Sequence, residues 1–222
     1  HAVKATKTWR CYLAGLKKLE VLHLAFTEVT DTGVESLQNL DNLKELNLNV
    51  TGMNDDGLKF LIGLPKLEKL FLTGSGVTDD GLSLIGKCTN LTELVLSENQ
   101  ISDVGLAHIK GLTKLESLAI SDSLVTDAGL SHLQNMTEMK GLNLENAQIT
   151  DTGLKYIGQM SNLEVLSLAK NHVTDAGVKH LRNLKDLEWL SLASTDMTDA
   201  GMEYLTGMTK LEHQRIDPRK GQ

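Results

Sequence analysis

The sequence contains few of the residues that identify several large classes of protein. Its 222 residues include only 2 prolines, 2 cysteines and 4% aromatic residues, and no apolar run is as long as a membrane span. A membrane-spanning helix needs about 18 or more consecutive apolar residues, and a disulfide framework needs more than one pair of cysteines. Hydrophobic residues at 41% and charged residues at 23% are typical of a globular chain. Disorder, a collagen-like rod and a disulfide scaffold are therefore disfavoured.

Positive charge is scarce over most of the chain. The net charge is −7, from 22 basic and 29 acidic residues. Residues 1–18 hold five of the basic residues and no acid, so the acidic character belongs to the rest of the chain. Binding to phosphate backbones requires a basic stripe. The sequence therefore argues against a nucleic-acid partner.

The cysteines and the first residue lead to further expectations. Cys11 and Cys88 lie far apart in the sequence and are expected to be free thiols. The chain starts at His1 rather than at a methionine, so no targeting segment can be read from it. The compartment is left open, with a cytoplasmic location slightly favoured over export, and a monomer is expected.

A repeat of 24 residues runs through the chain without an insertion or deletion. When Leu16 is taken as position 1, eight complete repeats cover residues 16–207. Positions 1, 4, 7, 9, 14, 19 and 22 are Leu, Ile, Val, Met or Cys in every repeat. The fifth repeat illustrates this pattern with Leu112, Leu115, Leu118, Ile120, Val125, Leu130 and Leu133. A fixed period of this length indicates a repeat architecture.

The local period changes within each repeat. Positions 7 and 9 have the spacing of a strand with one buried face, and positions 19 and 22 have that of a helix face. Position 15 always holds a residue that caps helices: Thr30, Asn54, Thr78, Ser102, Thr126, Thr150, Thr174 and Thr198. Position 16 is always aspartate, which suits the positive end of a helix dipole. Position 18 is always glycine, which would permit close approach of neighbouring helices or an unusual backbone angle.

These patterns predict a stack of strand, turn and helix units. One unit cannot bury its apolar side alone, so stacking gives a parallel sheet, a layer of helices and a continuous leucine core between them. Because helices are wider than strands, we expect the stack to curve. The predicted fold class is α/β: a right-handed β-α solenoid, or horseshoe, with a parallel sheet on the concave face and short helices on the convex face.

The repeat resembles the leucine-rich repeat family. The segment from Leu115 to Val125 is similar to the signature Leu-x-x-Leu-x-Leu-x-x-(Asn/Thr/Ser)-x-Val, with Ile120 as the third leucine. The Thr-Asp-x-Gly-Leu that follows resembles a 24-residue subclass common in bacteria and related to the cysteine-containing repeats of F-box-type receptors. The family's inward-pointing asparagine at position 12 is kept as Asn99 and Asn171. Hydroxyl groups can replace it in five repeats, at Thr27, Thr51, Ser75, Ser123 and Thr195, but Ala147 cannot.

The ends of the chain depart from the repeat. Residues 1–15 carry no consensus and are predicted to form an N-terminal cap. Residues 208–222 are predicted to form a partial ninth repeat and a C-terminal cap, because Gln214 replaces the position-7 leucine and Pro218 interrupts the strand pattern. An open solenoid needs such polar ends.

Two columns of titratable residues are candidate sites of chemistry. The position-16 aspartates recur in every repeat, and helices pack about 8–10 Å apart, so they are not paired catalytic carboxylates. Position 21 holds His108, His132 and His180, which are too far apart to share a zinc ion, as well as Tyr156 and Tyr204. We therefore expect no enzyme activity, no cofactor and no metal.

The strand residues expected to face outward differ from repeat to repeat. They occupy positions 6, 8, 10 and 11, where Glu45, Lys69 and Glu93 should form a charge ladder across the strands. Apolar residues on this face predict a binding site for a partner. The candidate partner-binding residues are Val21, His23, Phe26, Val50, Phe71, Val95 and Trp189. Trp189 is expected to be substantially exposed, because its neighbours Val165, Ser191 and His213 cannot bury an indole.

The resemblance implies a scaffold for protein–protein interaction that binds a protein partner on its concave face. Two alternatives stay open. The chain could be the targeting or substrate-recognition domain of a larger enzyme or ubiquitin-ligase-like protein. It could also bind carbohydrate or cell wall, a function that Trp189 and Phe71 would suit.

Overall fold

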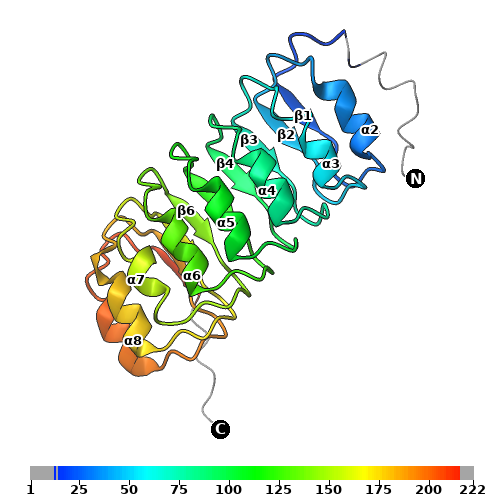
Figure 1. The fold of residues 1–222 in the computed structure, drawn as a ribbon. Coiled ribbons are helices and arrows are strands. Elements are labelled where there is room, and N and C mark those ends of the chain that lie inside the picture. Colours follow the sequence, from blue (N-terminus) through cyan, green and yellow to red (C-terminus); the bar gives the residue numbers. More distant parts are fainter. Residues whose placement is uncertain (1–12, 14, 216–222) are drawn as a thin grey trace.

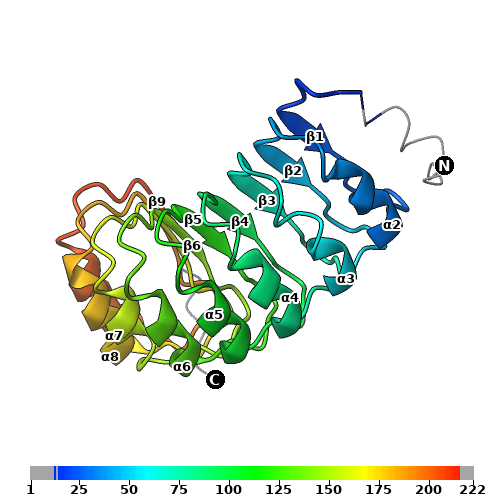
Figure 2. The same ribbon diagram turned by 45° about the horizontal axis from the view of Figure 1, so that its top comes forward.

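The computed structural model describes Leu13 and residues 15–215 of the chain. Most of the predicted N-terminal cap, Cys11 and Pro218 lie outside these residues. The described part is a curved stack in which the strands line the inner side of the arc and the helices form the outer side (Figures 1 and 2). This arrangement confirms the predicted solenoid.

The sheet is parallel and its strands follow the order of the chain. The described residues form nine strands of three residues each, and the first residue of each of the first eight strands is position 6 of its repeat. Successive strands pair in register, so that equivalent residues of neighbouring repeats lie side by side. The strands are β1 (Val21–His23), β2 (Glu45–Asn47), β3 (Lys69–Phe71), β4 (Glu93–Val95), β5 (Ser117–Ala119), β6 (Gly141–Asn143), β7 (Val165–Ser167), β8 (Trp189–Ser191) and β9 (His213–Arg215).

The convex side carries short α-helices and 3-10 helices. Most begin at the position-16 aspartate, so the predicted helix starts are confirmed for these repeats. They are α2 (Asp31–Val34), η1 (Glu35–Leu37), α3 (Asp55–Leu58), α4 (Asp79–Ile85), α5 (Asp103–Ile109), α6 (Asp127–Leu130), η2 (Ser131–Leu133), α7 (Leu154–Ile157), α8 (Asp175–Val178), η3 (Lys179–Asn183) and η4 (Asp199–Leu205). Within the described residues, no helix is both long and apolar enough to cross a bilayer.

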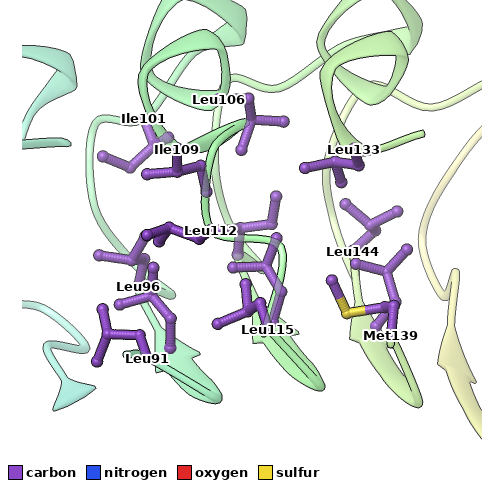
Figure 3. Close-up of a cluster of buried hydrophobic side chains, with 14 of the residues drawn as sticks. Leu91, Leu96, Ile101, Leu106, Ile109, Leu112, Leu115, Leu133, Met139 and Leu144 are labelled. Carbon is purple, nitrogen blue, oxygen red and sulfur yellow. The ribbon is translucent and has the colours of Figure 1, made fainter. Parts of the chain in front are cut away.

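The core is the set of apolar columns that the sequence predicts. Every one of these sites is buried except four, Leu16, Leu19, Leu22 and Met202. All four belong to the first or last complete repeat, where the stack provides fewer neighbours. Figure 3 shows how Leu96, Leu112 and Leu144 from successive repeats contribute to one continuous apolar layer.

A hydrogen-bonded clasp joins each helix start to the next repeat. The Asp103 carboxylate accepts a hydrogen bond from the backbone N–H of Thr126 at 2.8 Å and another from the Thr126 hydroxyl at 2.7 Å. The Thr126 hydroxyl in turn accepts the N–H of Ala128 at 3.3 Å, which is the predicted N-cap bond. Two bonds of the same kind link Asp55, Asp79, Asp127, Asp151 and Asp175 to the following repeat.

The clasp explains the invariant glycine at position 18. A Cβ atom on Gly129 would collide with Oδ1 of Asp103, and a Cβ on Gly57 would lie 2.7 Å from Oδ1 of Asp31. The glycines at this position have no positive φ, so backbone conformation does not require them. Close approach is therefore the reason for the glycine. The sequence predicted only that the aspartate interacts with the dipole of its own helix. Its hydrogen bonds to the next repeat were not predicted.

The position-12 residues bond to backbone inside the turns, as predicted. Asn99 donates from Nδ2 to the carbonyl of Leu72 at 2.7 Å and accepts the N–H of Val77 at 3.0 Å. Asn171 makes the equivalent bonds to Leu144 and Ile149. The Thr195 hydroxyl replaces part of this set with one bond.

We expect Asp127→Ala to lower the free energy of unfolding by about 2 kcal/mol, because it removes two hydrogen bonds to a charged acceptor. Asp199→Ala is the matched control, since within the described residues its carboxylate has no following repeat to bond. That variant should lose at most about 0.5 kcal/mol from the helix dipole. Urea unfolding measures both values. Equal losses for the two variants would restore the dipole interpretation.

Cys88 occupies the leucine site at position 1 and is a buried free thiol. Burial raises the pKa of the Cys88 thiol to about 11, so less than about 1% is thiolate at pH 8. In a Cys11→Ser background, we expect iodoacetamide to alkylate Cys88 at least about 100-fold more slowly in buffer than in urea. Similar rates in the two solvents would contradict this placement.

Candidate functional site

The outward-facing side chains of the sheet come from the first and last residues of each strand. The register places each one beside its equivalent in the next repeat, as with Glu45 and Lys69 or Phe71 and Val95. Adjacent strands lie about 4.8 Å apart. These side chains therefore form two continuous rows along the concave face, the position-6 row and the position-8 row.

The N-terminal half of the concave face is charged. Lys69 Nζ lies 3.1 Å from a carboxylate oxygen of Glu93, as the predicted ladder requires. Glu45 instead bonds to Nε2 of His23 at 2.7 Å, so the ladder is broken on that side. His23, predicted as a partner-binding residue, is thus engaged with its neighbour on β2.

Phe26 and Val50 do not lie on strands, contrary to the prediction. They occupy position 11, which has a positive φ in every complete repeat, with φ 58° for Phe26 and 51° for Val50. The strands end at position 8, and the chain then turns at the rim of the sheet. Phe26 is 77% exposed and Val50 is 45% exposed. A β-branched residue in this conformation is strained by about 1–2 kcal/mol.

A hollow of about 500 Å³ opens on the C-terminal half of the concave face. Its lining residues come from β5 to β8 and the turn after β6: Ser117, Leu118, Gly141, Leu142, Asn143, Glu145, Val165, Ser167 and Trp189. The register sets Gly141 between Ser117 and Val165 in the position-6 row. The three atoms nearest to a Cβ on Gly141 would all belong to Ser117, with the hydroxyl oxygen at 3.3 Å, so the side of Gly141 toward Val165 is open.

Trp189 forms one wall of this hollow and lies beside Val165 on the neighbouring strand. The indole is half-buried, whereas the sequence predicted substantial exposure. It is less exposed because it lines a concave surface instead of standing on a flat sheet. Val165 is 45% exposed, so the pair offers apolar surface to solvent.

A second hollow of about 990 Å³ lies among the turns that follow the strands of repeats 4 to 7. Polar side chains dominate its lining, and several of them bond to neighbouring polar side chains inside or outside the lining. Asn146 donates to Asp122 at 2.6 Å, Lys170 lies 2.8 Å from Glu145, and His172 contacts Asp196 at 3.3 Å. Leu124, which is 55% exposed, is the one large apolar side chain in this lining, and no Trp, Tyr or Phe stands beside it as Trp189 does in the first hollow.

The two columns of titratable residues have structural surroundings. The position-16 carboxylates from Asp31 to Asp175 accept bonds from the next repeat, as described above. His132, Tyr156 and His180 are half-buried and His108 is exposed, which fits the edge of a helix face. Among the described residues, no group of three His, Cys, Asp or Glu side chains could hold a metal ion.

The structure does not gather the seven predicted site residues into one place. Val21 and His23 lie on β1, Phe71 and Val95 are neighbours on β3 and β4, and Phe26 and Val50 lie in turns. Only Trp189 lines the hollow. Sequence reasoning missed Gly141 and Val165 as members of the site, although both share the position-6 row with Trp189.

Comparison with known proteins supports the fold assignment. Two family profiles, both described as leucine rich repeat, match residues 65–125 and residues 15–37, 136–158 and 159–181, which together are more than half of the chain. No curated protein matches the sequence.

Solved structures of bacterial proteins share the fold. Internalin C2 from Listeria monocytogenes is 25% identical with a TM-score of 0.73, over 94% of this chain and 84% of the other. A leucine-rich repeat protein from Leptospira interrogans is 23% identical with a TM-score of 0.68, over 92% of this chain. The chain spans 50% of the length of that protein.

Val50→Asn should raise the free energy of unfolding by about 1 kcal/mol, because asparagine tolerates the left-handed conformation that strains valine. Val21 provides the matched control, since it is similarly exposed but lies on β1. Val21→Asn should lower stability by a few tenths to about 1 kcal/mol, because valine favours strands. Thermal and urea unfolding of the two variants tests this opposite sign. A loss of stability in Val50→Asn would show that position 11 is not strained.

Proposed function

Since the chain belongs to the leucine-rich repeat family, we propose that it is a scaffold for protein–protein interaction that binds a partner protein on its concave face. The binding site is the C-terminal half of that face. The observation that carries this proposal is the hollow beside Trp189, where Val165 adds apolar surface and Gly141 leaves room for a partner side chain.

The composition of the hollow supports a protein interface. Aromatic residues near the centre of an interface carry a large share of binding energy, and such anchors sit in pockets. Isolated surface hydrophobics are common and need no function. Trp189 and Val165 are instead neighbours on paired strands and line one concavity of the sheet.

Charge supports the choice of partner class. The chain has a net charge of −7, and Glu164 and Glu188 directly precede two residues of the hollow, which disfavours a phosphate backbone. We assign no reaction and no cofactor to the chain. It acts as a monomer in this proposal, with residues 1–15 and 208–222 as caps of the eight repeats.

Two other functions suggested by the sequence remain proposals with their own tests. A recognition domain within a longer polypeptide would use the same hollow, and the full-length gene decides between the two. A carbohydrate ligand is favoured by one observation, the indole of Trp189 beside the amide of Asn143 and the hydroxyl of Ser167. A glycan array tests that ligand directly.

Trp189→Ala should weaken binding of the partner at least about tenfold, because a central aromatic contributes about 2 kcal/mol or more to an interface. The same change should cost only about 1 kcal/mol of stability, below the 3–5 kcal/mol of a core tryptophan, because the indole is half-buried. The partner is first identified by affinity capture and mass spectrometry, and calorimetry then measures both variants.

The matched control is Phe26→Ala, which removes an exposed aromatic side chain from the other end of the stack and should leave affinity unchanged. Full affinity in Trp189→Ala together with a loss in Phe26→Ala would move the site to the N-terminal half, around Phe26, Val50 and Phe71.

A further inference from the structure

The hollow is bordered by a row of acidic side chains. The residues at position 5 precede the strands, and in repeats 7, 8 and 9 they are Glu164, Glu188 and Glu212. Backbone bonds hold them side by side, since the N–H of Glu188 donates to the carbonyl of Glu164 at 2.8 Å and that of Glu212 donates to Glu188 at 3.0 Å. We call these three residues the acidic row. All three are exposed.

The acidic row differs from the same position earlier in the chain. There, lysines or a threonine separate the acids, and each lysine bonds to the acid of the preceding repeat, Lys44 to Glu20 at 2.8 Å and Lys140 to Glu116 at 2.8 Å. Within the described part of the chain, no salt bridge includes a carboxylate of the acidic row. Two lysines are in electrostatic range of the row, Lys140 of Glu164 and Lys210 of Glu188 and Glu164, but their ammonium groups bond to Glu116 at 2.8 Å and to Asp186 at 2.6 Å. Negative charge therefore remains in excess along this edge.

The acidic row and the hollow form one surface. Glu164 directly precedes Val165, and Glu188 directly precedes Trp189, so the acidic row lies one residue along the chain from two residues that line the hollow. On the opposite side, the charge of Glu145 is neutralised by Lys170 at 2.8 Å. The hollow thus combines an apolar wall with one negatively charged edge.

We propose that the occupant of the hollow is a segment of a partner protein that carries lysine or arginine side chains beside an aliphatic side chain. The aliphatic side chain contacts Val165 and Trp189 over Gly141, and the cations pair with Glu164 and Glu188. Exposed acidic side chains at a rim attract a basic partner and give salt-dependent association. This inference rests on the proposed function and adds the chemistry of the partner.

A random peptide library displayed on phage and selected on the whole protein tests the proposal. Selected peptides should contain more Lys and Arg than Asp and Glu, together with an aliphatic residue. Synthetic copies of these peptides should bind about tenfold more weakly to a Glu164→Gln/Glu188→Gln variant. The matched control is Glu20→Gln/Glu68→Gln, which makes the same change of charge at position 5 in the N-terminal half and should leave affinity unchanged.

A second pair of variants tests the hollow itself. Gly141→Val fills the space beside Ser117 and should weaken peptide binding at least about tenfold, while Ala119→Val adds the same side chain on the concave face outside the lining and should have little effect. Both variants are checked for an unchanged melting temperature. Affinity should also fall as salt is raised.

The outcomes separate this inference from the proposed function. Neutral or acidic peptides that lose binding in Gly141→Val would overturn the basic partner and leave the concave site standing. Peptides that bind Gly141→Val and Trp189→Ala as well as the unchanged protein would overturn both. A selection that yields no binder, or binding only to glycans, also counts against both.

Discussion

The carboxylate that reaches from each helix start into the next repeat is the interaction on which the rest of the structure depends. It fixes two neighbouring repeats to each other through a backbone N–H and a hydroxyl group, as between Asp103 and Thr126. The same hydroxyl caps the next helix, so helix formation and stacking are linked in one set of bonds. The carboxylate also occupies the space where a side chain at position 18 would lie, which is why Gly129 and its equivalents are glycine. Repeats joined in this way stack with one geometry, and the apolar columns between them close into a continuous core.

The hydrogen bonds of the clasp lie on the convex side of the stack, so the residues on the concave side can differ from repeat to repeat. Neither the clasp nor the apolar columns involve the position-6 and position-8 rows, so residues there can change without loss of the fold. In the N-terminal half the position-6 row carries charges that pair, as Lys69 does with Glu93. In the C-terminal half the row contains Gly141 between Ser117 and Val165, and this vacant place becomes a hollow with Trp189 as its wall. Recognition is therefore supported by a surface whose shape follows from the identities of a few outward-facing residues.

The architecture could be predicted from the sequence because a period of 24 residues repeats every structural constraint eight times. The core columns, the need for glycine at position 18 and most of the helix caps follow from that repetition, although Thr30 and Thr78 make no side-chain cap bond. The partner of the Asp103 carboxylate could not be predicted, because it lies 23 residues away in a repeat whose placement the sequence does not give. The left-handed turn at position 11 could not be predicted either. Glycine, the usual residue in this conformation, occurs at this position only as Gly74, and Phe26 and Val50 fit a strand pattern. The hollow was not predicted because it depends on the register of the sheet. That register places Gly141 between Ser117 and Val165, with Trp189 on the next strand.

Hydroxyl-radical footprinting tests the central claim most directly, which is that the C-terminal half of the concave face is the recognition surface. Oxidation of side chains is compared by mass spectrometry in the free protein and with a saturating partner or selected peptide. Trp189 is the reporter inside the hollow, and two exposed side chains outside it, Phe26 in a turn and Met202 on η4, are the internal references. We predict that the ligand protects Trp189 and leaves oxidation of Phe26 and Met202 unchanged. Protection of Phe26 or Met202 with unchanged oxidation of Trp189 would contradict it.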